Sequence, residues 1–191
     1  MSKGAMIAAA VFGAVLATAP IAFAQEEGYT PVPVIKGVKS LEAGVKAPDF
    51  TVKDLEGKTF VFSTERAGRG QLLVFWSIFC EPCREEMPLI QKIADEYGAA
   101  GSLGVLAVNM DGEPFSDGIK GFLRQYKYSV KVILDELDAK GEQFAIADPY
   151  QVAGTPVIYL VDSSGTIAGS HLGRITESEL RAMISRMLEK K

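Results

Sequence analysis

The sequence predicts an α/β domain built on a central mixed β-sheet with helices on both of its faces. Between residues 72 and 134, short apolar runs alternate with amphipathic stretches, which is typical of strands joined by helices. After residue 154, two apolar runs flank a polar turn and a last amphipathic stretch follows them. An antiparallel hairpin and a terminal helix should therefore complete the domain.

The first elements expected are the two strands of a β-hairpin. Residues 50–52 and 59–62 are strand-like, and they flank residues 54–58, where Gly57 supplies the positive φ that a tight turn needs. A loop at residues 67–70 leads to the central strand, which is apolar throughout, as expected of a strand buried on both faces. The strands expected after the hairpin are at residues 72–76, 103–109, 130–134, 157–161 and 167–172.

The first long helix should begin at Pro82, because the first turn of a helix does not need the N–H group that proline lacks. Pro88 lies inside this stretch and removes the hydrogen bond to the carbonyl of Arg84, so a kink is expected there. Two glycines at residues 98–101 mark the end of the helix.

Three further helices are expected. The apolar pattern predicts a second helix over residues 115–126 and a short one over residues 141–147. Thr176 and Glu179 have the spacing of a capping box, in which each residue satisfies an N–H group of the other at a helix start. The last helix should therefore begin there and run to residue 188.

The first 24 residues have the pattern of a secretory signal peptide. Lys3 is their only charged residue, an apolar segment follows it, and the segment ends in Ala22-Phe23-Ala24, with small residues at a cleavage point. The alternative is an uncleaved membrane anchor formed by residues 4–24, which are uncharged and nearly long enough to span a bilayer. The expected domains are a signal peptide at 1–24, an extended leader at 25–45 and a folded domain at 46–191.

The charge balance argues against nucleic acid as a partner. The net charge is −4, and it becomes −5 if Lys3 is removed with the signal peptide. The chain has no dense run of Lys or Arg, which a protein that binds nucleic acid would be expected to have. Export would also place the cysteines in a compartment where disulfides persist.

The two cysteines, Cys80 and Cys83, lie where a buried strand is expected to pass into a helix. The N–H groups of the first helical turn lack intrahelical partners, and together with the helix dipole they favour a thiolate. Such positions lower a cysteine pKa from about 8.5 to between about 3.5 and 7.5. Two intervening residues let Cys83 reach back over one turn to form a disulfide with Cys80. Because so short a loop gains little stability from a bridge, the pair is predicted to be reactive.

Metal and haem sites are not expected. One Cys-x-x-Cys pair and one histidine, His171, leave the usual four positions of a zinc site unfilled. Covalent haem attachment needs a histidine directly after the second cysteine, and Arg84 stands there. His171 is expected to be structural or exposed on the last strand, and no cofactor is predicted.

Taken together, these features resemble the thioredoxin superfamily, specifically its exported TlpA/ResA-like thiol:disulfide oxidoreductases, which are related to the AhpC/TSA and Redoxin proteins. The resemblance covers about residues 47–188. Its motifs are Ala47-Pro48-Asp49-Phe50-Thr51, Asp54-Leu55-Glu56-Gly57-Lys58, Phe75-Trp76, Cys80-Glu81-Pro82-Cys83, Glu86-Met87-Pro88 and Gly154-Thr155-Pro156. It implies a thioredoxin-like fold with an N-terminal β-hairpin extension, an inserted strand–helix unit and a cis peptide bond before Pro156.

The resemblance also implies the roles of the site residues. Cys80 attacks a disulfide of a partner protein, and Cys83 then displaces that partner. The backbone of Thr155, turned by the cis bond, pairs with an extended substrate segment as an added strand. The residues expected to contact or flank the substrate are Trp76, Glu81, Pro82, Thr155 and Pro156. Trp76 is expected to lie in the core or beside the site rather than to be catalytic.

The sequence departs from the family pattern at two positions. Phe79 replaces the tryptophan that many relatives have before the first cysteine, which alters substrate contacts and leaves the thiol chemistry intact. Val74 occupies the place of the buried aspartate of thioredoxin. Glu86, three residues after Cys83 on the same helix, matches the glutamate of the ResA-like members, and the resemblance implies that it is the substitute proton carrier. The alternative is that Glu86 is an ordinary first-turn acid that complements the helix dipole.

The function implied is that of an exported, periplasmic reductase of protein disulfides, of the type that serves cytochrome c maturation. Its partners would be disulfide-bearing client proteins, with apocytochrome c as one candidate, and a membrane protein that donates electrons through thiols; the protein itself is expected to be a monomer. Two alternatives remain. A peroxiredoxin-like peroxidase would have proline seven residues before the cysteine, where Leu73 stands, and a non-catalytic binding module would use the same groove without turnover.

Overall fold

The computed structural model describes residues 40–138 and 140–189. The expected signal peptide at residues 1–24, the alternative anchor at 4–24 and most of the leader lie outside the described residues. In the part of the chain that is described, no helix is both long enough and apolar enough to cross a lipid bilayer.

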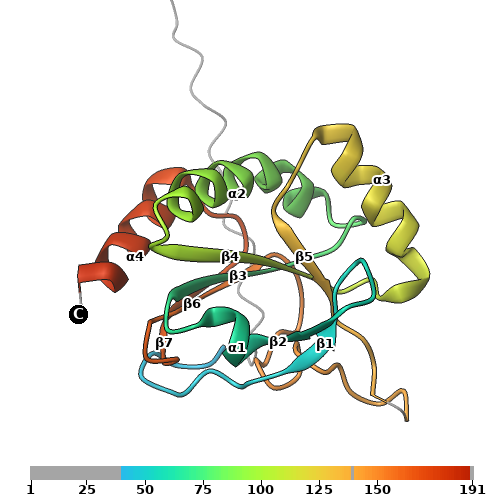
Figure 1. Ribbon diagram of the computed structural model, residues 1–191, viewed down its shortest axis with the longest axis horizontal. Coiled ribbons are helices and arrows are strands. Elements are labelled where there is room, and N and C mark those ends of the chain that lie inside the picture. The colour runs from blue at the N-terminus through green and yellow to red at the C-terminus, as the bar shows by residue number, and fades with distance from the viewer. Residues whose placement is uncertain (1–39, 139, 190–191) are drawn as a thin grey trace, which may run out of the picture. The chain divides into compact units, whose positions relative to one another are not determined.

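A five-stranded mixed sheet forms the centre of the domain, with the strand order β5-β4-β3-β6-β7 (Figure 1). Strand β3 is parallel to β4, which is parallel to β5, whereas β6 runs antiparallel to both β3 and β7. The strands are β3 (Gly70–Trp76), β4 (Leu103–Asn109), β5 (Lys131–Leu134), β6 (Val157–Val161) and β7 (Ile167–Leu172). The predicted bounds of β4, β6 and β7 are confirmed residue for residue.

Three helices cover one face of this sheet, and a hairpin with a short helix covers the other (Figure 1). The helices on the first face are α2 (Glu81–Ala99), α3 (Ser116–Tyr126), which follows the 3₁₀ helix η1 (Glu113–Phe115), and α4 (Glu177–Glu189). The elements on the second face are β1 (Thr51–Lys53), β2 (Thr59–Val61) and α1 (Phe62–Arg66). The α/β fold with a mixed sheet and an N-terminal hairpin is thus confirmed.

The alternation of side chains along β3 divides the apolar core into two halves. Successive side chains of a strand point to opposite faces of the sheet. Leu72, Val74 and Trp76 pack into the half beneath α2 and α4, whereas Leu73 and Phe75 pack into the half beneath the hairpin. Because both faces are covered, the central strand is apolar at every one of these positions.

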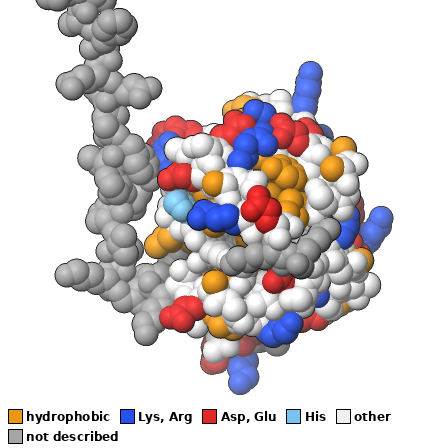
Figure 2. All heavy atoms as spheres, turned by 90° about the vertical axis from the view of Figure 1, so that its left-hand side faces the viewer, with side chains coloured by type: hydrophobic (Ala, Val, Ile, Leu, Met, Phe, Trp, Pro, Cys, Tyr) orange, Lys and Arg blue, Asp and Glu red, His pale blue; other side chains and the backbone are white. Residues whose placement is uncertain are grey.

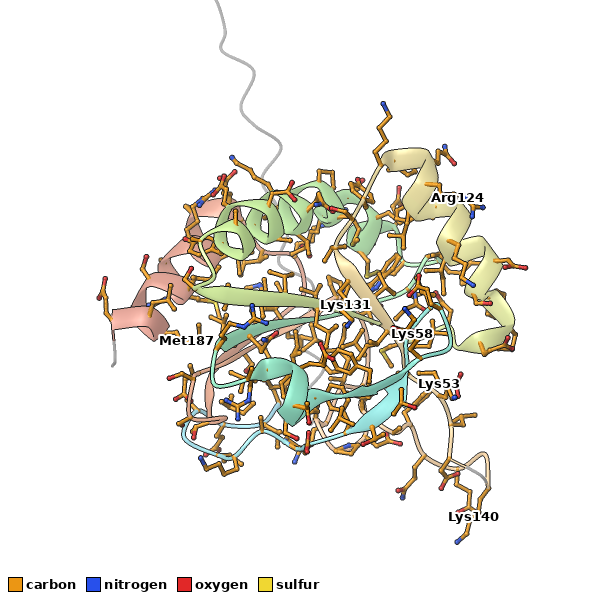
Figure 3. The ribbon with its side chains drawn as sticks, in the orientation of Figure 1. Lys53, Lys58, Arg124, Lys131, Lys140 and Met187 are labelled. Atoms are coloured by element: carbon orange, nitrogen blue, oxygen red, sulfur yellow. A yellow bond between two sulfur atoms is a disulfide. The ribbon has the colours of Figure 1, made fainter. Side chains whose placement is uncertain are left out.

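The two covering layers contact the sheet through particular side chains (Figure 3). Met187 of α4 lies over the start of β3, where a Cβ atom on Gly70 would come within 2.9 Å of the Met187 methyl carbon. On the other face, the ammonium group of Lys131, on β5, lies 4.7 Å from the centre of the Phe60 ring of β2. The first contact packs α4 against the sheet, and the second joins the edge strand β5 to the hairpin.

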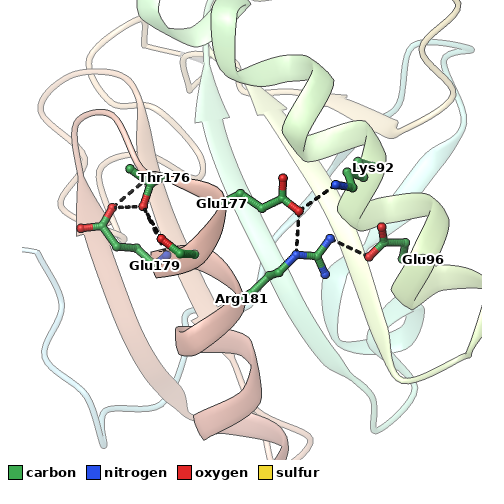
Figure 4. Close-up of polar contacts among 7 residues, drawn as sticks. Lys92, Glu96, Thr176, Glu177, Glu179 and Arg181 are labelled. Carbon is green, nitrogen blue, oxygen red and sulfur yellow. Dashed lines mark hydrogen bonds and ion pairs between the residues drawn. The ribbon is translucent and has the colours of Figure 1, made fainter. Parts of the chain in front are cut away.

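A charged cluster holds α2 against α4 (Figure 4). Glu177 accepts hydrogen bonds of 2.8 Å from both Lys92 and Arg181, and Arg181 also pairs with Glu96 at 2.8 Å. The capping box predicted at the start of α4 is also confirmed. The Thr176 N–H donates to the Glu179 carboxylate at 2.9 Å, and the Glu179 N–H donates to the Thr176 hydroxyl at 3.3 Å.

The prediction of a short helix at residues 141–147 is wrong. This segment consists of turns, with an isolated bridge between Leu137 and Phe144. The buried carboxylate of Asp135 accepts hydrogen bonds from the N–H groups of Ile146 at 2.9 Å and Ala147 at 2.7 Å. These N–H groups are therefore held by a side chain at the end of β5, and a seven-residue helix has too few backbone bonds of its own to compete.

Helix α1 is a second difference, since residue 62 was expected to end a strand. The carboxylate of Asp49 accepts hydrogen bonds from both the N–H group of Ser63, at 2.8 Å, and its hydroxyl, at 2.6 Å. This partner lies fourteen residues before Ser63 and stabilises the first turn from outside the helix. Farther along, α2 continues through Pro88 as one helix.

Candidate active site

Cys80 and Cys83 form a disulfide at the beginning of α2, with their Cα atoms 5.2 Å apart. Cys80 is the N-cap residue of the helix, and the N–H group of Cys83 donates a 3.2 Å hydrogen bond to the Cys80 sulfur. Pro82 occupies the first turn, where its missing N–H costs nothing. The predicted position of the pair, between the central strand and a helix start, is confirmed.

The two sulfurs differ in access to solvent. Cys80 is partly exposed, whereas the side chain of Cys83 is only 2% exposed. Because thiol–disulfide exchange needs access to the attacking sulfur, a partner protein can reach Cys80 and not Cys83. The site thus has an outer sulfur that meets other molecules and an inner sulfur that meets only the outer one.

The loop before Cys80 is held by Asp111, a residue that sequence reasoning missed. Its carboxylate accepts hydrogen bonds from the Ser77 hydroxyl at 2.6 Å and from the Ile78 N–H at 2.8 Å. Asn109, which is fully buried at the end of β4, donates a 2.9 Å hydrogen bond to the same carboxylate. Polar residues at the end of a predicted parallel strand next to the central one were the available signal, because such ends meet at one edge of the sheet.

Glu86 is buried, with 7% of its surface exposed, on the helix that begins with the cysteines. One carboxyl oxygen accepts a 2.8 Å hydrogen bond from the Ile175 N–H, and the other has no hydrogen-bond partner among the described residues. Burial raises the pKa of Glu86 from 4.5 to about 7, although the Ile175 hydrogen bond and the charge of Arg174 both act to lower it. An exposed first-turn acid would not be in such surroundings.

The Thr155–Pro156 peptide bond is cis, as the resemblance implies. Pro156 is buried and Thr155 is partly exposed, directly before β6, the strand that pairs with β3. Of the other expected contacts, Glu81 is exposed and Pro82 partly exposed beside the disulfide. These residues therefore surround the end of β3 where Cys80 lies.

Trp76 lies in the core and has no exposed surface. Its ring packs against Phe122 of α3, with the ring centres 5.6 Å apart. No atom of Trp76 is thus available to a substrate in this structure. An aromatic side chain that is exposed at the site is Phe79, which is 67% exposed directly before Cys80.

The polar groups of the domain do not gather into a metal site. Within residues 40–138 and 140–189, no group of three or more His, Cys, Asp or Glu side chains is placed to hold a metal ion. His171 lies on β7, and its Nε2 atom is 2.8 Å from the carbonyl oxygen of Arg174. The histidine therefore takes part in the turn that follows β7.

Comparison with known proteins agrees with this geometry. The model of the Redoxin family matches residues 42–184. Thioredoxin-like protein YneN of Bacillus subtilis is 33% identical over 141 residues, which cover 73% of this chain and 77% of YneN. Thiol-disulfide oxidoreductase ResA of Halalkalibacterium halodurans is 32% identical over 151 residues, covering 78% of this chain and 80% of ResA.

Solved structures show the same likeness. A protein of Chlorobium tepidum assigned as thiol:disulfide interchange protein DsbE has a TM-score of 0.65 at 31% identity, covering 78% of this chain and 99% of that one. StoA of Bacillus subtilis has a TM-score of 0.56 at 25% identity, covering 71% of this chain and 96% of StoA. The chain therefore belongs to the Redoxin family, and within the thioredoxin superfamily it is a TlpA/ResA-like thiol–disulfide oxidoreductase.

Proposed function

We propose that the protein is exported and reduces disulfides of partner proteins by dithiol exchange through Cys80 and Cys83. The observation that carries this proposal is the asymmetry of the pair, a partly exposed sulfur at a helix N-cap bonded to a buried one. The names of the relatives YneN, ResA and DsbE support the general chemistry. We further propose the direction of electron transfer, the client proteins and the cellular compartment, as argued below.

The first step uses the reduced protein. The Cys80 thiolate attacks one sulfur of the client disulfide, the client S–S bond breaks, and the second client sulfur leaves as a thiolate. A mixed disulfide then joins Cys80 to the client. The Cys83 N–H, which points at the Cys80 sulfur, stabilises the negative charge of the thiolate before attack.

The second step releases the client. Cys83 gives up its proton, its thiolate attacks the Cys80 sulfur, and the mixed disulfide breaks so that the client leaves with both of its sulfurs reduced. Two electrons have then passed from the dithiol to the client, and the protein has the disulfide seen in this structure. Glu86 is the proposed acceptor of the Cys83 proton. With its pKa raised to about 7, its carboxylate is still partly deprotonated at neutral pH and binds a proton more readily there than an ordinary exposed acid would.

The client is proposed to bind across the carboxyl ends of the central strands. The Thr155 backbone would pair with an extended client segment, with Glu81, Pro82 and Pro156 beside it. Trp76 is not included, because it has no exposed surface. Phe79, which is exposed, is proposed as the aromatic residue that contacts the client in place of Trp76.

We place this activity outside the cytoplasm because residues 1–24 have a signal-peptide pattern and residues 4–24 could serve as an anchor. An exported reductase needs electrons from a membrane protein that passes them through thiols. Client cytochromes c before haem attachment fit such a protein, because their haem-binding cysteines must stay reduced. The protein is proposed to act as a monomer.

A peroxiredoxin-like activity is disfavoured by Leu73, which lies where the peroxidatic motif has proline. Leu73 is fully buried in the middle of β3 and is paired on both sides, with Leu106 and with Tyr159. Proline cannot donate to a strand ladder and is rare in a central strand. The sequence before Cys80 thus serves the sheet rather than a peroxide site.

Three measurements test the proposal. Equilibration with glutathione and dithiothreitol buffers should place the reduction potential near or below the thioredoxin value of about −270 mV, and a value near that of DsbA, about −120 mV, would exclude a reductant. In addition, Cys83→Ser should trap clients as stable mixed disulfides, and Cys80→Ser should not. The third measurement is the reduction of insulin disulfides. If the protein reduces no insulin and traps no client, the alternative of a non-catalytic binding module is supported instead.

A further inference from the structure

The turn between β7 and α4, residues 173–176, contacts both sides of the dithiol site. The Gly173 N–H donates a 2.9 Å hydrogen bond to the carbonyl of Pro156, one of the residues proposed to lie beside the client. Two residues later, the Ile175 N–H donates a 2.8 Å hydrogen bond to the buried Glu86 carboxylate. One short segment thus links the surface that would hold the client to the buried carboxylate three residues after Cys83 on α2.

Arg174 is the residue between these two hydrogen bonds. Its guanidinium group forms an ion pair with Glu85, the neighbour of Glu86 on α2. Its own carbonyl oxygen is 2.8 Å from Nε2 of His171, so its backbone is also held from β7. Figure 2 shows that the single histidine of the chain, in pale blue, reaches the surface among charged side chains. Arg174 is therefore held at both its backbone and its side chain.

The charges around Glu86 come from two elements. On α2, the carboxylate of Glu85 repels a negative charge on Glu86 and raises its pKa. From the turn, the guanidinium of Arg174 attracts that negative charge and lowers the pKa. Arg174 also forms an ion pair with Glu85, so its positive charge lies beside the negative charge that repels Glu86. Burial remains the largest effect on Glu86, and Arg174 opposes it.

We propose that Arg174 is a positioning residue for thiol exchange, which keeps the 173–176 turn bonded to Glu86 and thereby lets Glu86 accept the Cys83 proton at neutral pH. This inference rests on the proposed function, since it requires Glu86 to take that proton. Without Arg174, Glu86 would hold its own proton up to a higher pH. Release of the client would then slow at neutral pH and recover in alkaline solution.

The test is the pH dependence of client reduction between pH 5.5 and 9. With Arg174→Gln, the rise in rate with pH should move upward by about half a pH unit, the size expected for a partly exposed ion pair. The rate at pH 6.5 should therefore fall about two- to threefold, while the rate at pH 9 stays close to that of the wild type. Arg174→Lys should restore most of the wild-type profile, because it keeps the charge.

The matched control is Arg181→Gln. Like Arg174→Gln it removes an arginine that forms ion pairs on the protein surface, in this case with Glu96 and Glu177 (Figure 4), but Arg181 is not among the charges that shift the pKa of Glu86. Its profile should coincide with that of the wild type. In the Glu86→Gln background, Arg174→Gln should cause no further shift. Salt tests the same charge without mutation: about 1 M KCl screens exposed pairs and should move the wild-type profile toward that of Arg174→Gln.

A profile of Arg174→Gln that coincides with the wild type, or an equal shift in the Glu86→Gln background, would overturn the inference. Should the variant fold poorly, the carboxyl carbon of Glu86 can be titrated by NMR in oxidised wild-type protein at low and high salt, where an unchanged midpoint has the same meaning. If Glu86→Gln itself leaves the profile unchanged, the proton-acceptor role in the proposed function is wrong and the inference is wrong with it. If only Arg174→Gln has no effect, the inference alone is wrong.

Discussion

The ring of Phe79 contacts the ring of Phe115 edge to face, with the ring centres 5.1 Å apart and the planes at 83°. Phe79 precedes Cys80, and Phe115 ends η1, in the segment that joins β4 to α3. Both rings are substantially exposed. The loop of the reactive cysteine and the segment before α3 thus share an apolar surface beside the disulfide.

Phe79→Ala should weaken the binding of protein clients without changing the reactivity of the Cys80 thiol. An aromatic contact is worth roughly 0.5–1.5 kcal/mol beyond its buried area, so KM for a protein disulfide should rise about two- to tenfold. The rate with a small disulfide such as hydroxyethyl disulfide should stay the same, because it does not extend to the rings. Tyr126→Ala, an exposed aromatic at the far end of α3, is the control. An equal loss with both substrates would contradict a docking role.

Asp111→Ala should disturb the loop that carries Cys80. The change leaves the Ser77 hydroxyl and the Ile78 N–H, both partly buried, without their acceptor, so the free energy of unfolding should fall by about 1–3 kcal/mol. Exchange with small disulfides should slow as well, because the sulfur is held less firmly. Urea denaturation and stopped-flow kinetics measure the two effects, with Asp117→Ala, an exposed acid of α3, as the control. Wild-type kinetics in the Asp111 variant would show that the network only stabilises the fold.

Glu86→Gln should make the oxidised protein more stable in alkaline solution. The pKa of Glu86 is raised to about 7 in the folded protein from 4.5, so the protonated form favours folding and its contribution is lost as the pH rises through 7. The variant, which keeps a neutral group at this position, should match the wild type near pH 4 and exceed it at pH 8.5. The expected difference is on the order of 1–3 kcal/mol.

Urea denaturation of both proteins at several pH values measures this difference. Glu81→Gln is the matched control, since Glu81 is an exposed acid at the start of the same helix. Its stability relative to the wild type should not increase between pH 4 and 8.5. A wild-type protein that is equally or more stable than Glu86→Gln at pH 8.5 would mean that the buried carboxylate is not strained by its charge.

Asp135→Ala should destabilise the segment that replaces the predicted short helix. The fully buried carboxylate is the acceptor for the N–H groups of Ile146 and Ala147, and removing it leaves both without this partner. At about 1–3 kcal/mol for each unsatisfied group, the free energy of unfolding should fall by several kcal/mol. Asp148→Ala, an exposed acid in the same segment, should cost less. Similar stabilities of the two variants would mean that residues 135–147 refold around the loss.

The order of elements could be predicted because each depends on residues close together in the sequence. The apolar run in β4, the polar turn between β6 and β7 and the capping box of Thr176 and Glu179 are all local patterns. The position of Cys80 and Cys83 at a helix start is local too, since Pro82 and the preceding apolar strand specify it. These patterns were sufficient for the fold class and for the two reactive sulfurs.

The elements that were predicted wrongly, and the site residue that was not predicted, depend on partners that are distant in the sequence. Asp49 starts α1 through Ser63, Asp135 holds residues 146 and 147 in turns, and Asp111 holds the loop before Cys80 across the strand ends. Each is a carboxylate that accepts backbone or hydroxyl hydrogen bonds only once the chain has folded around it.

The sequence by itself determined the redox pair, the strand–helix order and the location of the site at one end of the central strand, because these follow from short-range periodicity and helix-start chemistry. Only the tertiary structure decided which sulfur is exposed, that Trp76 is enclosed, and that Glu86 is buried against the Ile175 N–H, 89 residues away. Burial and long-range hydrogen bonds arise from packing of distant segments, and they set the proton affinity of Glu86 on which the proposed chemistry depends.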